Sequence, residues 1–340
     1  MINSGRINNP VRLDQRAIAD EVARLNRPVV VQFSESPISA RILQEVDQLC
    51  DHFGENLEVR FYGHYGGHFD ATLLRHVPSV QRLTVDCLQA ISNADEVGKL
   101  PLLSHLRFGV YDFSDRDFLA SLDIARLESL SISENRKRDI DLSPLAHAET
   151  LKRLYIEGHT SGIQHITEVP HLSDLVLRAC PKSQSIGFVN NIRSLKKLEL
   201  VLGGRQSIDE LAHPQIETLQ ILRVQGLQSL GNLARFPALR HLRVEDQIKL
   251  HTIDLAMANL LRISVSNCKA LTEIEALNCQ TELEELFIAR TAADVERLMH
   301  AKWPDSLRCL GLFKNSRKWV DQMTTAVEAR GLKVYGTGWY

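Results

Sequence analysis

Hydrophobic residues recur along this chain in one short pattern, in which an apolar residue is followed three and five positions later by two more. The segment Leu151-Lys-Arg-Leu154-Tyr-Ile156 shows the pattern, with polar or amphipathic residues between the apolar ones. Successive side chains of a β-strand point to opposite faces, so the fourth and sixth positions point inward and the third, fifth and seventh point outward. The pattern therefore predicts short strands with one buried face and one open face.

The pattern occurs eleven times between residues 80 and 312, at spacings of 20 to 24 residues. The predicted cores are Val80-Leu83-Val85, Leu103-Leu106-Phe108, Leu127-Leu130-Ile132, Leu151-Leu154-Ile156, Leu172-Leu175-Leu177, Leu195-Leu198-Leu200, Leu219-Leu222-Val224, Leu239-Leu242-Val244, Leu260-Ile263-Val265, Leu283-Leu286-Ile288 and Leu307-Leu310-Leu312. No single repeat can bury its apolar side alone. The period predicts a solenoid, in which the repeats stack as parallel strands about 4.8 Å apart.

These repeats match L-x-x-L-x-L, and over roughly residues 57 to 313 the chain resembles the leucine-rich repeat family. The return Asp141-Leu142-Ser143-Pro144-Leu145 resembles those of short bacterial internalin-like and related intracellular arrays. The resemblance implies an α/β solenoid, a leucine-rich repeat horseshoe with a parallel concave β-sheet and short helical or irregular returns. The family's ninth position is usually Asn or Cys. Only four of the eleven repeats comply, so we expect turns of uneven shape. The four are Asn135, Cys180, Cys268 and Asn315.

Three regions are expected: an N-terminal cap over residues 1–56, the repeat array over 57–313 and a C-terminal cap over 314–340. The first cap should contain a helix over 14–25 with Asp14 as its N-cap, a strand over 29–33 and a second helix that starts at Ser36 and Pro37. Gly54 should end this second helix, and a strand over 57–61 should follow.

Near the other end of the chain, a helix over 292–301 is predicted, with Thr291 as its cap. In the C-terminal cap, Trp319, Met323 and Val327 follow a helical rhythm, and a strand over 332–335 should close the array. Trp319, Trp339 and Tyr340 could instead form a docking site.

Bulk properties are those of an ordinary soluble protein. Of the 340 residues, 44% are hydrophobic and 24% charged, with a net charge of -2. No stretch has the length of a membrane span, and the N-terminus lacks the apolar core of a signal peptide. The six cysteines contain no C-x-x-C pair, which favours reduced thiols over a disulfide framework or a zinc site. We therefore expect a cytoplasmic protein without membrane contact.

One loop outside the repeats carries residues capable of metal chemistry. Between Gly63 and Asp70 it contains His64, His68 and Asp70, which are residue types that can bind a transition metal. Their spacing matches no common metal site, and a glycine-rich turn after a strand explains the same residues. A metal-dependent effector enzyme centred on this loop is the alternative from a different functional class.

The outward positions of the repeats are where a partner would bind. Over the second, third, fifth and seventh positions, 12 Lys or Arg stand against 8 Asp or Glu. Such a surface suits an acidic or mixed-charge protein partner, although exposed strand positions also carry charge for solubility. Nucleic acid is disfavoured because acidic residues interrupt the basic ones. The candidate partner-binding residues are Arg107, Arg153, Tyr155, Arg178, Lys197, Arg223, Arg243, Arg262 and Phe287.

Catalysis finds no support in the motifs. The sequence contains no G-x-S-x-G, no H-E-x-x-H and no phosphate-binding glycine loop. We therefore expect a non-enzymatic protein-binding scaffold without a cofactor, acting as an adaptor or inhibitor. The habits of the family add an immunity-type protein that neutralises a toxin as a further alternative.

Overall fold

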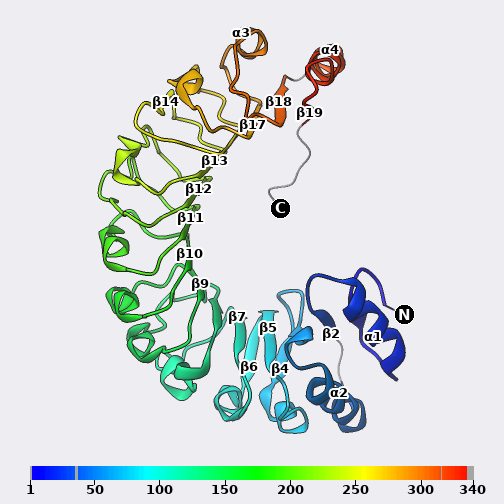
Figure 1. Cartoon of the computed structure of the whole chain (residues 1–340). Helices are drawn as coiled ribbons and strands as arrows, with labels where there is room; N and C mark the ends of the chain where they lie inside the picture. Colours follow the sequence, from blue (N-terminus) through cyan, green and yellow to red (C-terminus); the bar gives the residue numbers. More distant parts are fainter. Residues whose placement is uncertain (1, 35–36, 315, 335–340) are drawn as a thin grey trace. The chain divides into compact units, whose positions relative to one another are not determined.

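The computed structural model describes residues 2–34, 37–314 and 316–334 of the chain. The chain divides into two compact units, Met1–Leu172 (unit 1) and Ser173–Tyr340 (unit 2). In each unit the main strands follow one another in chain order across a parallel sheet. Figure 1 shows that the returns of each unit lie along the outer side of its strands. The prediction of an α/β solenoid with a parallel sheet and short returns is confirmed.

The described part of unit 1 contains a main sheet, a small second sheet and two α-helices. The main strands are β1 (Arg6–Asn8), β2 (Val29–Phe33), β3 (Leu57–Tyr62), β5 (Arg82–Leu88), β7 (His105–Val110), β8 (Ser129–Ile132) and β9 (Arg153–Glu157), and the second sheet pairs β4 (His68–Asp70) with β6 (Ala90–Ser92). The α-helices are α1 (Gln15–Arg24) and α2 (Ala40–Phe53). The 3-10 helices are η1 (Gly54–Asn56), η2 (Ala71–His76), η3 (Ala94–Lys99), η4 (Phe118–Ser121), η5 (Ile124–Arg126), η6 (Ser143–His147) and η7 (Ile163–Glu168).

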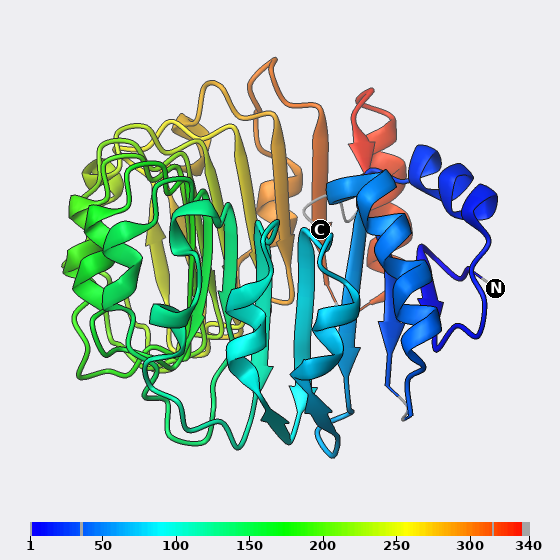
Figure 2. The ribbon, with the colours of Figure 1, turned by 90° about the horizontal axis from the view of Figure 1, so that it is seen from below.

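Alternation along the strands builds the core of unit 1. In β3 every second residue from Leu57 to Phe61 is buried, and the residues between are half-buried on the opposite face. The Phe61 ring stacks on those of Phe33 and Phe69, at centroid distances of 5.5 and 4.4 Å. Figure 2 shows the blue-to-cyan strands of this unit running side by side. The apolar side is thus closed and the other side is left for polar residues.

Unit 2 repeats this arrangement. Its main strands are β10 (Asp174–Arg178), β11 (Lys197–Val201), β12 (Thr218–Leu222), β13 (His241–Glu245), β15 (Arg262–Ser266), β17 (Glu285–Ala289), β18 (Cys309–Phe313) and β19 (Lys333–Val334), and a second sheet pairs β14 (Thr252–Asp254) with β16 (Glu273–Glu275). Its helices are η8 (Gly187–Asn191), η9 (Leu233–Arg235), η10 (Leu277–Cys279), α3 (Val295–Met299) and α4 (Arg317–Glu328).

The ninth position of the repeat supplies partners for backbone groups at the turns, as Asn does in the family. The Asn135 side chain donates to a backbone carbonyl at 3.0 Å. At the same position His159 is 1% exposed, and its Nδ1 accepts from the backbone N–H of Ile140 at 3.1 Å. Gln247 is fully buried and donates to the carbonyl of Ile221 at 3.3 Å. Histidine and glutamine at this position thus make hydrogen bonds to the backbone, in place of the Asn or Cys that we expected there.

One repeat has a register other than the one predicted. On β12, Leu219 and Ile221 point inward whereas Leu222 points outward and is half-buried. The core of this repeat is Ile216-Leu219-Ile221, not Leu219-Leu222-Val224. The sequence contains two overlapping matches three residues apart, and pairing with the strand before selects the first.

The helices outside the repeats lie where the sequence predicts them, but some begin at a residue other than the predicted one. Asp14 caps α1 as predicted, accepting from a backbone N–H at 3.1 Å. The predicted start of α2 is wrong, because Ser39 provides the cap and Pro37 precedes the helix. Likewise Asp294, and not Thr291, caps α3. Five predicted positions, Ser36, Asn315, Tyr335, Trp339 and Tyr340, lie outside the described residues.

Candidate functional site

The outward side chains of unit 1 form rows because neighbouring strands pair in register. One row, from β5 to β9, contains Arg82, His105, Ser129 and Arg153. The next row contains Thr84, Arg107, Ser131 and Tyr155. Backbones in such rows are about 4.8 Å apart, so the two rows make one continuous surface. We call this surface the open face of unit 1.

Four residues of this face, Arg82, His105, Arg107 and Arg153, form what we call the basic cluster. His105 is 6% exposed, and its Nε2 lies 3.3 Å from Nη2 of Arg153. A guanidinium can only donate, so Nε2 must accept and the imidazole proton must sit on Nδ1. The Nδ1 atom is 2.9 Å from the hydroxyl of Ser104, which accepts that proton in a hydrogen bond. This geometry requires a neutral His105.

The electrostatics of the cluster follow from burial and from like charge. Burial, followed by the neighbouring charges of Arg82 and Arg153, lowers the pKa of His105 to about 4. Burial also lowers the pKa of Arg82, against the opposing effect of Glu58 and with the help of Arg153 and Arg107. The guanidinium groups of Arg153 and Arg107 thus lie close enough to Arg82 to disfavour its charged form.

Among the described residues the arginines of the cluster form no ion pair with a carboxylate, although the more distant Glu58 and Glu55 favour the charged form of Arg82. The Nε atom of Arg82 is buried without a hydrogen-bond partner there. Arg107 is exposed and makes no hydrogen bond or ion pair in the described part of the chain. Arg153 is exposed and has His105 as its side-chain contact. Their donors are therefore available to a ligand.

Small hydroxyl side chains lie between the larger ones. Strand β8 presents Ser129 and Ser131 to the open face, between side chains of β7 and β9, and Ser133 follows directly after the strand, beside Gly109. We call these three residues the serine column. Within the described residues their hydroxyl groups have no hydrogen-bond partner. They offer neutral donors beside the arginine charges.

A fourth arginine of unit 1 shows the opposite arrangement. Arg60 on β3 donates to Asp86 at 2.7 Å and to Gln32 at 3.3 Å, and lies 4.5 Å from the ring centroid of Tyr62. Burial lowers its pKa, but the hydrogen bond and charge of Asp86 outweigh burial, so the pKa is raised. Arg60 is therefore a satisfied structural group.

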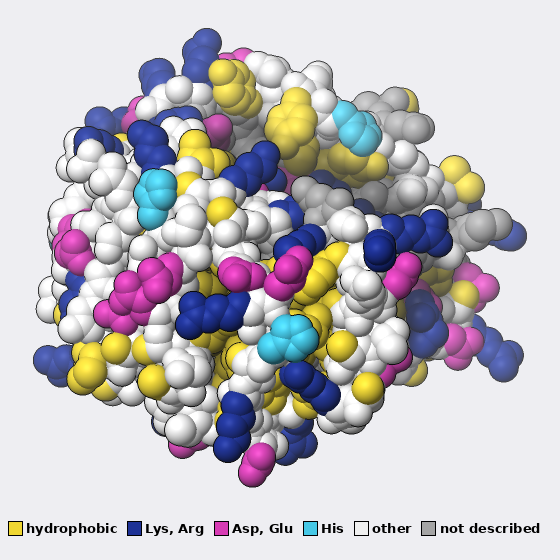
Figure 3. Space-filling view, turned by 90° about the horizontal axis from the view of Figure 1, so that it is seen from above, with side chains coloured by type: hydrophobic (Ala, Val, Ile, Leu, Met, Phe, Trp, Pro, Cys, Tyr) yellow, Lys and Arg dark blue, Asp and Glu magenta, His cyan; other side chains and the backbone are white. Residues whose placement is uncertain are grey.

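The open face of unit 2, defined by the same outward positions, carries five of the predicted partner-binding residues. They are Arg178, Lys197, Arg243, Arg262 and Phe287. Arg243 pairs with Glu245 at 2.5 Å, and Arg262 lies 3.5 Å from Glu285. Figure 3 shows the molecule from above, and on the side that it displays acidic and basic side chains are interspersed.

The predicted place of Arg223 is wrong. In the corrected register Gln220 occupies the fifth position and is 7% exposed. Arg223 follows β12 in the turn, with φ of 54°, and pairs with Asp246 at 2.6 Å. Replacing Arg223 by Glu217 in the tally of outward positions leaves 11 Lys or Arg against 9 Asp or Glu. The overall basic excess is thus small, and its local distribution matters more.

The loop with His64, His68 and Asp70 has its own structural explanation. Asp70 caps η2 by accepting from the backbone N–H of Thr72 at 3.0 Å, and also accepts from Asn93 at 2.8 Å. The ring of His64 packs edge-on against that of Tyr62. Among the described residues no group of three or more His, Cys, Asp or Glu is placed to hold a metal.

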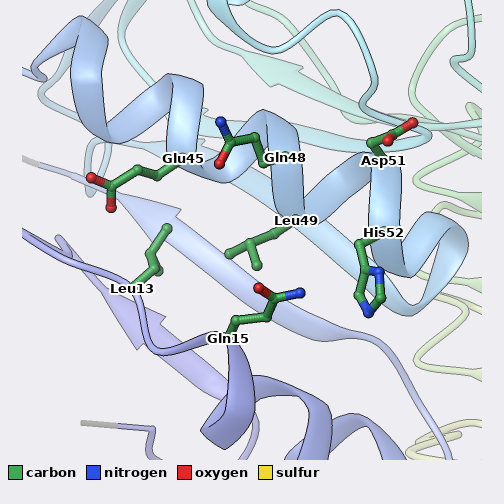
Figure 4. Close-up of a pocket in the computed structure, with 7 residues that line it drawn as sticks. All are labelled: Leu13, Gln15, Glu45, Gln48, Leu49, Asp51 and His52. Atoms are coloured by element: carbon green, nitrogen blue, oxygen red, sulfur yellow. The ribbon is translucent and has the colours of Figure 1, made fainter.

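A cavity of about 610 Å³ lies beside α2 in unit 1, lined mainly by polar residues. Figure 4 shows Leu13 and Gln15 on one side and side chains of α2 on the other, with Glu45, Asp51 and His52 pointing away from one another. These three groups do not converge on one point. The cavity therefore offers less chemistry than the basic cluster.

Sequence reasoning named Arg107, Arg153 and Tyr155, and the structure brings them together in unit 1. It did not single out His105 or the serine column. The sequence does contain the information needed to find His105. The third residues of the first four repeats form one row, which contains Arg82, His105, Ser129 and Arg153. The sequence does not show, however, which of these side chains form hydrogen bonds or ion pairs with one another.

Comparison with known proteins agrees with this architecture. An internalin from Listeria monocytogenes is 18% identical, with a TM-score of 0.53 over 89% of this chain and 83% of that one. A leucine-rich repeat protein from Leptospira interrogans is 16% identical, with a TM-score of 0.44 over 90% of this chain and 89% of that one. No family model and no curated protein matches the sequence.

Stacked parallel strands with short returns define a solenoid repeat protein. More particularly, the chain has the leucine-rich repeat fold, as its apolar pattern predicts. Among the described residues, the helices are too short or too polar to cross a bilayer.

Proposed function

We propose that this protein is a non-enzymatic scaffold that holds a protein partner on the open faces of its sheets, as an adaptor or inhibitor in the cytoplasm. The observation that carries the proposal is that Arg107 and Tyr155 lie in one row of unit 1, on either side of Ser131. Arginine and tyrosine are enriched among the residues that dominate protein interfaces. A reducing compartment agrees with the free thiols of all six cysteines.

The shape of the surface also supports a macromolecular partner. In unit 1, outward side chains from β3, β5, β7, β8 and β9 stand in register over one sheet. A surface of this kind presents many weak contacts over a wide area, which suits a protein better than a small molecule.

The test is a comparison of two double variants. Arg107→Glu with Tyr155→Ala changes the open face, whereas Tyr111→Ala with Arg193→Glu makes the same exchanges at exposed residues outside it. The partner is captured by cross-linking from cells, identified, purified and titrated against each variant by calorimetry. We expect the first pair to weaken binding at least tenfold, by about 1.4 kcal/mol or more, and the second to leave it unchanged. Equal affinity of both pairs would remove this face from consideration.

A further inference from the structure

We propose that the basic cluster of unit 1 binds carboxylate side chains in an acidic segment of the protein partner. The inference rests on the proposed function and adds the chemistry of the partner to it. The position of Arg82, Arg107 and Arg153 around a neutral His105 carries it.

The charges argue for a missing anion. Arg82 is half-buried, and burial, with smaller contributions from Arg153 and Arg107, lowers its pKa although Glu58 and Glu55 oppose the shift. A sheet surface kept only for solubility can alternate positive and negative side chains, whereas here three guanidinium groups form no ion pair with a carboxylate among the described residues. A carboxylate from outside would relieve the repulsion and accept paired N–H donors.

The serine column supplies the space and further donors. Ser129 lies between His105 and Arg153, and Ser131 lies between Arg107 and Tyr155. The Arg153 side chain already crosses Ser129 to reach His105 at 3.3 Å, so the room for a carboxylate lies above Ser131, whose side chain is short. The arginines would contribute charge-assisted hydrogen bonds and the hydroxyl groups would contribute neutral ones.

Carboxylates at the margin of the cluster limit what can bind. Glu58 accepts from Thr84 at 2.8 Å, and Glu128 pairs with Lys152 at 2.8 Å. Glu157 accepts from the Tyr155 hydroxyl at 3.1 Å, and Glu55 lies 3.9 Å from Nδ1 of His105. These groups would repel a long polyanion but leave the centre open to one or two carboxylates. A short acidic segment fits better than nucleic acid.

The experiment uses fluorescently labelled hexaglutamate as the probe and hexaglutamine as its neutral counterpart, titrated with the full chain by anisotropy. Arg107→Gln with Arg153→Gln should weaken hexaglutamate binding about tenfold or more. Arg16→Gln with Arg193→Gln removes the same charge from exposed residues elsewhere and should leave it unchanged. Equal weakening by both pairs, or equal binding of hexaglutamine, would overturn the proposal.

A second variant separates loss of the site from loss of the fold. Ser131→Glu places a carboxylate of the protein itself among the arginines. We expect it to abolish hexaglutamate binding while the melting temperature stays the same or rises, because the new charge is attracted to the cluster. A lower melting temperature with undiminished binding would contradict the proposed site.

Inorganic phosphate distinguishes the source of the anion. If phosphate displaces the probe at lower concentration than free hexaglutamate does, the site prefers phosphate and the acidic-segment proposal fails. The scaffold is judged separately with the purified partner. Loss of partner binding in Arg107→Glu with Tyr155→Ala, together with no binding of hexaglutamate, would retain the scaffold and reject the acidic segment.

Discussion

The open faces of the two units carry similar side chains but differ in how these are paired. In unit 2, Arg243 pairs with Glu245 and Arg262 approaches Glu285. In unit 1, Arg82, Arg107 and Arg153 form no ion pair with a carboxylate among the described residues, and Glu58 and Glu55 act on Arg82 only from farther away. A count of basic residues treats the two faces alike. The buried Nε of Arg262 lacks a hydrogen-bond partner within the described residues, as that of Arg82 does, so the two faces differ in ion pairing: Arg262 lies 3.5 Å from a carboxylate and Arg82 has none within ion-pair distance there.

We expect the largest effect from a change to Arg60, the arginine of unit 1 that forms an ion pair with Asp86. Arg60→Gln should lower the free energy of unfolding by about 3 kcal/mol, because Asp86 would stay largely buried without its charged partner. Arg126→Gln breaks an exposed pair with Asp123 in the same unit and should cost less than about 0.5 kcal/mol. Urea unfolding measures both. Similar losses would mean that burial of the pair does not matter.

The second prediction compares histidines at the same repeat position of the two units. The folded-state pKa of His105 is about 4, below the ordinary 6.5, so its contribution to stability is present above pH 6.5 and is lost as pH falls toward 4. The loss by pH 5 should be about 2 kcal/mol. Burial followed by Arg262 also lowers the pKa of His241, which is half-buried.

The free energy of unfolding is measured between pH 7 and 5 for the wild type and two variants. His105→Gln should flatten its pH dependence, and His241→Gln should change it less. The charged groups that act on His105 are Arg82, Arg153, Glu128 and Lys152, with Glu55 near its Nδ1. None of them is altered in the variant. An unchanged slope in His105→Gln would show that the histidine is not held neutral by its surroundings.

The two faces also show what sequence can predict. The strands, their parallel stacking and the buried leucines follow from periodicity, because alternation along a strand fixes which side chains are inward. The repeat pattern predicted the wrong register at β12, because Leu222 and Val224 stand at the spacing expected of inward residues. It could not show that Arg223 has Asp246 as a partner. Pairing depends on which residues of neighbouring repeats meet, and that requires the register of both.

A smaller effect is expected from unpairing an arginine in unit 2. In the background of Arg107→Gln with Arg153→Gln, the further change Glu285→Gln removes the carboxylate beside Arg262. Affinity for hexaglutamate should recover about threefold, since the half-buried guanidinium of Arg262 loses its own carboxylate. Glu296→Gln is the control, because it frees Lys314 away from the strand rows. If the affinity for hexaglutamate does not recover, ion pairing with carboxylates does not explain the difference between the two faces.

The smallest effect is expected where a side chain has no partner to lose. Arg107→Gln should change the free energy of unfolding by less than about 0.5 kcal/mol, because the exposed guanidinium makes no hydrogen bond or ion pair within the described residues. Any gain from reduced repulsion of Arg82 should shrink in 1 M NaCl, where the screening length is about 3 Å. Urea unfolding at low and high salt measures both quantities. A loss above about 1 kcal/mol would mean that Arg107 stabilises the fold, and the basic cluster would then need no ligand to explain it.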